Sequence, residues 1–168
     1  ETVKKLLLRA QPKLMPDEVS TLLRVAEGSI GKALQFYRDD GITIYKSLLT
    51  IAGSLPQLDL VAAHEIAEKM GRQIDEDVFL TVRDIMVGWC NRVVAATARQ
   101  QPVADLMPGD SMIFSRLCTA YPSGHFMAAG EKIAQFFDLT LRFNLDKRQA
   151  ILGSFLMLQQ PDYQALAA

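Results

Sequence analysis

Apolar residues recur along most of this chain at the three-and-four spacing of an amphipathic helix, and no segment alternates apolar and polar residues over a useful length. The pattern predicts an all-α protein. We expect helices at about 2–10, 16–26, 29–38, 42–52, 59–71, 76–99, 111–120, 124–143 and 147–159. Aspartates that can cap a helix N-terminus stand at the start of four of these segments: Asp59, Asp75, Asp110 and Asp146.

The segment 76–99 has the most regular apolar stripe and is expected to be a core helix of about six turns. Its central residues are Val82, Ile85, Met86, Trp89 and Val93. The stripe continues on both sides of Trp89. This favours a core position for the Trp89 side chain over a position in which it faces a partner subunit.

Aromatic residues gather in the last third of the chain. Phe136 and Phe137 are adjacent, so they lie on two faces of the helix predicted there. A helix that is apolar on more than one face is either deeply buried or docks against a partner. We expect some of this apolar surplus to serve association.

Two breaks divide the chain. Gly28 is expected to end one helix in the left-handed conformation, and Ser29 to cap the next. The polar segment 39–41 (Asp-Asp-Gly) is expected to be a domain boundary, which gives one domain at 1–41 and a second at 42–168. The segment 100–108 contains two prolines and is expected to be a mobile loop.

The turn Gly28-Ser29-Ile30-Gly31-Lys32, followed by Ala33-Leu34, resembles a turn in the lid of AAA+ clamp-loader ATPases. There a Gly-Ser-x-Arg-x-Ala-Leu pattern presents an arginine, called sensor 2, to the phosphates of a nucleotide. Gly31 stands in the place of that arginine. A turn that lacks this arginine resembles the one in the delta-prime subunits of the bacterial DNA polymerase III clamp loader, which do not hydrolyse ATP. The segments 9–26, 55–59 and 144–152 also resemble parts of these subunits.

The resemblance implies a three-helix AAA+ lid at 1–41 and a helical collar at 42–168, with Gly28, Ser29, Gly31 and Lys32 as a degenerate nucleotide-sensing turn. It implies that the chain is a cytoplasmic piece of a longer protein with an AAA+ core upstream. The piece itself is then expected to have no cofactor and no catalytic activity. The partners it implies are gamma/tau-type and delta-type clamp-loader subunits, with the sliding clamp and primed DNA reached through the whole complex. An ATP-hydrolysing gamma/tau-type subunit is the near alternative, which Gly31 disfavours.

Composition narrows the function further. The formal net charge is −1 and the basic residues are spread along the chain, so a dedicated nucleic-acid-binding face is not expected. No apolar run has the ~18–20 residues needed to cross a bilayer. The two cysteines, Cys90 and Cys118, lie in apolar stretches and are expected to be buried free thiols. A P-loop is absent, so this chain is not expected to hydrolyse a nucleotide by itself.

A metal enzyme built on a helical bundle is the alternative from another class. His64 and Glu68 are one helical turn apart, as in zinc-protease helices, but the second histidine of that motif is missing. Ser123 and His125 are close in sequence, yet a turn entering a helix explains them without a catalytic triad. We therefore expect no metal site and no nucleophilic catalysis.

Overall fold

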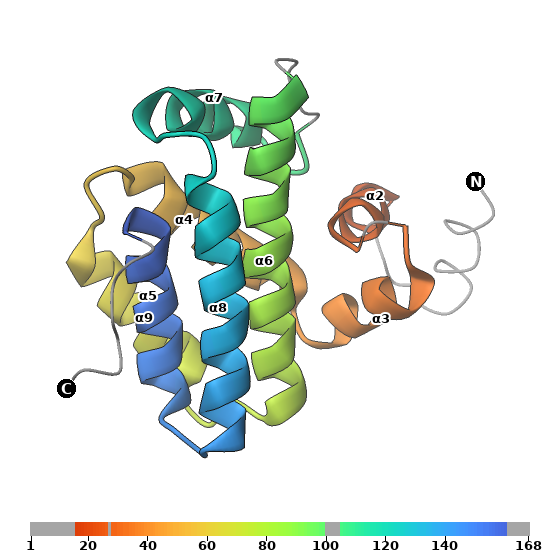
Figure 1. The fold of residues 1–168 in the computed structure, drawn as a ribbon. Helices are drawn as coiled ribbons and strands as arrows, with labels where there is room; N and C mark the ends of the chain where they lie inside the picture. Colours follow the sequence, from red (N-terminus) through yellow and green to blue (C-terminus); the bar gives the residue numbers. More distant parts are fainter. Residues whose placement is uncertain (1–15, 27, 100–104, 161–168) are drawn as a thin grey trace.

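The computed structural model describes residues 16–26, 28–99 and 105–160, and all the regular structure in these ranges is α-helical (Figure 1). The helices are α2 (Pro16–Val25), α3 (Ile30–Arg38), α4 (Gly41–Ser54), α5 (Leu60–Gly71), α6 (Glu76–Arg99), α7 (Asp110–Ala120), α8 (His125–Arg142) and α9 (Lys147–Gln159). The predicted all-α class is therefore confirmed for the described residues. The helix predicted at 2–10 lies outside them.

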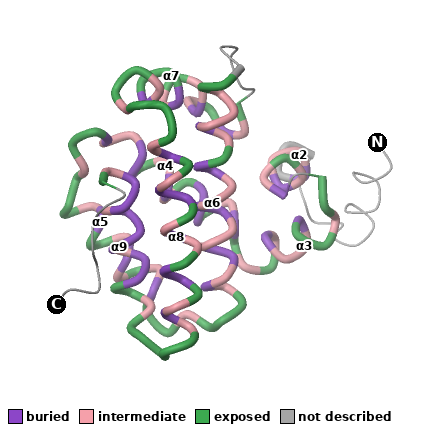
Figure 2. Tube along the Cα trace, viewed as in Figure 1, coloured by how far each residue is buried: buried purple, intermediate pink, exposed green. Residues whose placement is uncertain are grey.

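Five helices close into a ring of contacts around one core. Helix α6 packs on α8, α8 on α9, α9 on α5, α5 on α4, and α4 returns to α6. Helix α7 lies across one end of this bundle and contacts α4 and α6, while α2 and α3 form a hairpin that joins the bundle through α4 (Figure 1). The buried segments of α4, α6, α8 and α9 face inward, and the turns between helices are mostly exposed (Figure 2).

Helix α6 supplies the centre of the core. The five residues of its stripe, Val82, Ile85, Met86, Trp89 and Val93, are each at most 1% exposed. The Trp89 ring meets Phe114 of α7 at a centroid distance of 5.8 Å and Phe126 of α8 at 5.6 Å, the latter edge to face. One indole thus contacts two neighbouring helices, as aromatic rings in tilted and edge-to-face pairs favour.

The adjacent phenylalanines of α8 are both inside the chain. Phe137 is fully buried and stacks on Phe79 of α6 at 4.3 Å, and Phe136 is also buried. The second face of α8 is covered by α9, so this pair does not provide the docking surplus that the sequence suggested. Phe143, one residue after α8, is 61% exposed.

Close approach of α5 and α9 depends on a missing side chain. A Cβ atom added to Gly71 would lie 2.5 Å from Cγ and 2.8 Å from Cα of Arg148. Because the second contact is with backbone, no rotation of the arginine side chain would relieve it. Gly71 therefore allows the last turn of α5 to reach the first turn of α9.

Three of the four predicted aspartate caps are confirmed. The carboxylates of Asp59, Asp75 and Asp146 accept backbone N–H groups at 3.0, 2.8 and 2.8 Å. The prediction for Asp110 is wrong, because Gly109 holds the N-cap position with φ +97° and Asp110 is the first residue of α7. Its side chain is fully buried and is used elsewhere.

No helix in the described ranges is long and apolar enough to span a membrane. Cys90 is buried and Cys118 partly exposed, and both are free thiols. The prediction of burial thus holds fully for Cys90 only.

Replacing Trp89 with alanine should lower the free energy of unfolding by about 3–5 kcal/mol, because a large side chain in contact with α7 and α8 leaves a cavity. Urea denaturation of the full chain measures this. Met112→Ala is the matched control, since Met112 is 77% exposed on α7 and its loss should change stability by less than about 0.5 kcal/mol. A urea denaturation curve of Trp89→Ala that matches that of the native chain would contradict the assignment of Trp89 to the core.

Stability should fall at alkaline pH through Cys90. Burial raises the pKa of the Cys90 thiol from 9.0 to about 12. The unfolded thiol ionises first, so its contribution is intact below pH 9 and lost as the pH rises toward 12, at about 1.4 kcal/mol per pH unit. Denaturation of the native chain and of Cys90→Ala between pH 7 and 11 tests this. The difference between the two chains should shrink with rising pH, and parallel curves would contradict it.

Candidate functional site

The turn between α2 and α3 has the geometry that its sequence predicts. Gly28 has φ +80°, and its N–H donates to the carbonyl of Leu23 at 2.8 Å, closing the end of α2. The Ser29 hydroxyl accepts the N–H of Lys32 at 3.4 Å and so caps α3. The left-handed glycine and the capping serine together set the direction in which α3 leaves α2.

Gly31 lies in the first turn of α3 and is exposed. A Cβ atom at this position would meet nothing within 4 Å, so the backbone leaves room for a long side chain there. Gly28, Ser29 and Lys32 are exposed as well. The four residues of the turn therefore form an open surface, and the one cation among them, Lys32, lies about 100° around the helix from position 31.

A polar cluster joins the end of α3 to α6. The Gln35 amide donates to the Thr81 hydroxyl at 3.2 Å, and that hydroxyl donates to the carboxylate of Asp39. Thr81 is fully buried. Asp40 follows with φ 53°, a left-handed conformation that aspartate tolerates better than most residues. The predicted domain boundary thus coincides with a sharp, hydrogen-bonded turn.

A second cluster lies between α4, α6 and α7 and consists of the buried Tyr45 and Asp110 and the half-buried Arg92. One oxygen of Asp110, Oδ2, accepts the Tyr45 hydroxyl at 2.9 Å and Arg92 Nη1 at 3.1 Å. The same Arg92 nitrogen lies 2.7 Å from the Tyr45 oxygen, and the guanidinium lies over the Phe114 ring. Burial raises the pKa of the Tyr45 hydroxyl well above its usual range, so it stays a donor.

This second cluster was not predicted from the sequence. Its members come from three helices and are 18 to 65 residues apart. Tyr45 and Arg92 stand in helices with ordinary amphipathic patterns, and Asp110 has the position of a capping residue. A possible signal was Gly109, since a glycine immediately before a helix can itself hold the N-cap position and leave the aspartate to other partners.

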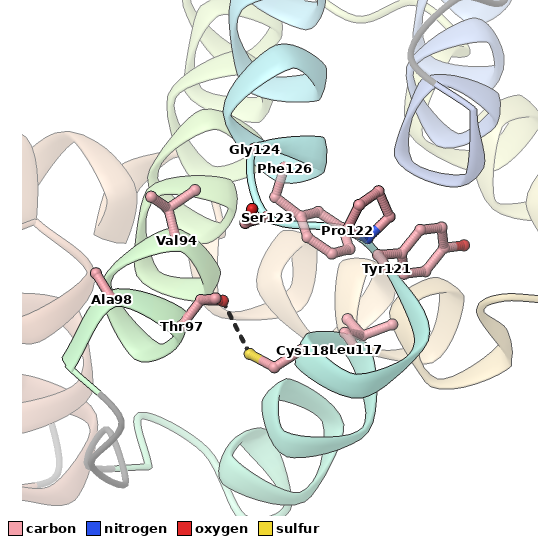
Figure 3. Close-up of a pocket in the computed structure, with 10 residues that line it drawn as sticks. All are labelled: Val94, Thr97, Ala98, Leu117, Cys118, Tyr121, Pro122, Ser123, Gly124 and Phe126. Atoms are coloured by element: carbon pink, nitrogen blue, oxygen red, sulfur yellow. Dashed lines mark hydrogen bonds between the residues drawn. The ribbon is translucent and has the colours of Figure 1, made fainter.

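A small pocket of about 160 Å³ lies between the end of α6 and the α7–α8 turn, lined in part by Thr97, Cys118, Tyr121 and Ser123 (Figure 3). The Cys118 sulfur is 3.0 Å from the Thr97 hydroxyl. His125 is turned to the carbonyl of Leu158, 2.8 Å from its Nε2, and its ring packs on Tyr121. Ser123 and His125 thus contribute to the turn, and His125 has a structural partner.

His64 and Glu68 do not converge on a common site in the described structure. His64 is exposed, and the Glu68 carboxylate lies 3.4 Å from Nη1 of Arg148 on α9. Within the described ranges, no three His, Cys, Asp or Glu side chains are grouped so that they could hold a metal ion. Of the two residues, Glu68 therefore contributes to the contact between α5 and α9.

Comparison of the chain with models of protein families, with curated proteins and with solved structures gives no match. The assignment of a function therefore depends on the residues and their arrangement. A proposed function has to account for the Gly28–Lys32 turn, which connects the two helices of the hairpin beside an all-helical bundle.

Proposed function

We propose that this chain is the lid and collar portion of a delta-prime-like subunit of the bacterial DNA polymerase III clamp loader. The observation that carries the proposal is the Gly28–Lys32 turn. It combines the glycine stop, the serine cap and the open first helical turn of a sensor-2 element with glycine in place of the arginine. In this proposal α2 and α3 belong to the lid and α4–α9 form the collar.

The role is mechanical. The lid passes a neighbouring subunit's nucleotide state to a rigid-body rotation, and the collar holds the ring of subunits together. Gamma/tau-type and delta-type subunits are the direct partners, and the sliding clamp and primed DNA are reached through the assembled loader in the cytoplasm. The exposed apolar side chains Leu60, Val61, Met112 and Phe143 are available for such contacts.

Catalysis is not assigned to this chain. Its turn offers no arginine at position 31, and the sequence contains no phosphate-binding loop. Arg92 does not supply the missing cation, because its guanidinium is half-buried and paired with Asp110 between α6 and α7. These features favour the delta-prime-like role over an ATP-hydrolysing gamma/tau-type one.

Size-exclusion chromatography with purified gamma/tau-type and delta-type subunits tests the proposal. The chain should co-elute with them as a complex of defined mass. Trp89→Ala, expected to lose about 3–5 kcal/mol of stability, is the control for adhesion through apolar surface that unfolding exposes, and it should enter the complex less than the native chain. Separate elution of the folded native chain from both subunit types would overturn the proposal.

The chain alone should bind ATP with a dissociation constant above about 1 mM, since it offers the ATP phosphates neither a P-loop nor a sensor arginine. Titration calorimetry with ATP and magnesium measures it. Gly31→Arg is the matched variant. It should fold normally, with a change in stability under about 1 kcal/mol, because position 31 faces open space. A clear saturable isotherm for the native chain would contradict this prediction.

A further inference from the structure

The segment 105–110 between α6 and α7 is bonded on its inner side to the bundle. The backbone N–H groups of Leu106 and Met107 donate to Oδ2 of Asp110 at 3.0 and 3.3 Å. The left-handed Gly109 turns the chain so that the Asp110 carboxylate faces back toward them. The Asp105 carboxylate accepts the N–H of Ser111 at 2.7 Å, so the segment also caps its own helix.

The bundle in turn fixes Asp110. The oxygen that receives the two N–H groups also receives the Tyr45 hydroxyl from α4 and the Arg92 guanidinium from α6. Four donors therefore converge on one oxygen of a fully buried carboxylate. Such charge-assisted bonds in a buried place are short-range and directional, so the position of Leu106 and Met107 follows from the positions of α4, α6 and α7.

On its outer side the same segment is bonded to the hairpin. The carbonyl of Asp105 accepts Nη1 of Arg24 at 3.0 Å, and the carbonyl of Leu106 accepts the hydroxyl of Thr21 at 3.4 Å. Thr21 and Arg24 are three residues apart on α2 and so share one face of that helix. Leu106 thus gives its N–H to the bundle and its C=O to the hairpin.

Apart from its packing on α4, the hairpin has a second polar attachment at the chain connection. Thr81 of α6 holds Gln35 and Asp39 beside the turn into α4, where Asp40 is left-handed. This attachment is close to the point about which the hairpin would turn. The bonds from Arg24 and Thr21 come from the other helix of the hairpin, α2, and tie it to the segment that precedes α7.

We infer that residues 105–110 are a latch that fixes the angle between the α2–α3 hairpin and the bundle. Asp110 is the positioning residue on the bundle side, and Arg24 and Thr21 are the releasable contacts. Release frees α2 to move about the 39–41 turn while the bundle stays intact. The inference concerns the mechanics of this chain and holds whether or not the proposed function is correct.

Distances between spin labels test the latch in the full chain. The labels are placed at Lys32→Cys on α3 and Gln135→Cys on α8, both exposed positions, in a Cys90→Ala and Cys118→Ser background. The latch variant is Thr21→Val with Arg24→Ala. The matched control is Arg38→Ala, which removes an exposed arginine from the same hairpin outside the latch.

The latch variant should give a broader distance distribution than the native chain, and the control should not. A latch variant with the native distribution would overturn the inference, and so would equal broadening in both variants. Hydrogen exchange on the same proteins supplies a second readout. Amides of α2 should exchange about tenfold faster in the latch variant, as expected for losing two hydrogen bonds at a locally opening element.

The amides of Leu106 and Met107 should stay protected in the latch variant, because their acceptor is Asp110 and not α2. Loss of their protection would show that α2 positions the segment, and would overturn the role assigned to Asp110. Neither readout involves nucleotide or other subunits, so failure of the latch is distinguishable from failure of the proposed function.

Discussion

Burial of the α6 stripe is the constraint from which the rest of the architecture follows. Helix α6 contacts α4, α7 and α8, and its apolar side chains are closed off from water on each of these sides. Apolar area removed from water is the largest favourable term in folding. Helices α5 and α9 then complete the ring by packing on each other, at a point where Gly71 lets two backbones approach.

Within this apolar frame a charged group is buried at the junction of three helices. Taking a carboxylate out of water costs several kcal/mol unless donors replace the solvent. Asp110 satisfies this condition on one oxygen, while Oδ1 has no hydrogen-bond partner in the described structure. Because Asp110 needs donors, Tyr45, Arg92 and the backbone of residues 105–107 are held in one relative arrangement. Hydrogen bonds depend on direction and apolar packing does not, so the polar cluster orients helices that apolar contacts alone would leave less well defined.

Periodicity and capping residues were sufficient to place the described helices to within about two residues, because those signals are local to each helix. The Gly28–Ser29 turn followed for the same reason. The roles of Asp110 and Phe136 could not be predicted, since each depends on which distant helix lies opposite. The segment 100–108 was expected to be mobile, yet residues 105–107 are held by bonds to α2 and Asp110. Residues 100–104 lie outside the described structure.

The contacts of Leu106 have a consequence for how this chain can vary. Both of its bonds are made by one main-chain residue, so its side chain is irrelevant to them, and any residue that keeps an N–H group satisfies the geometry. Proline is the exception. The Leu106 side chain packs against the core, so an apolar residue other than proline at this position would keep both the packing and the two bonds. The two side chains that meet this main-chain residue, Thr21 and Asp110, are 89 positions apart, so no local sequence motif marks the connection.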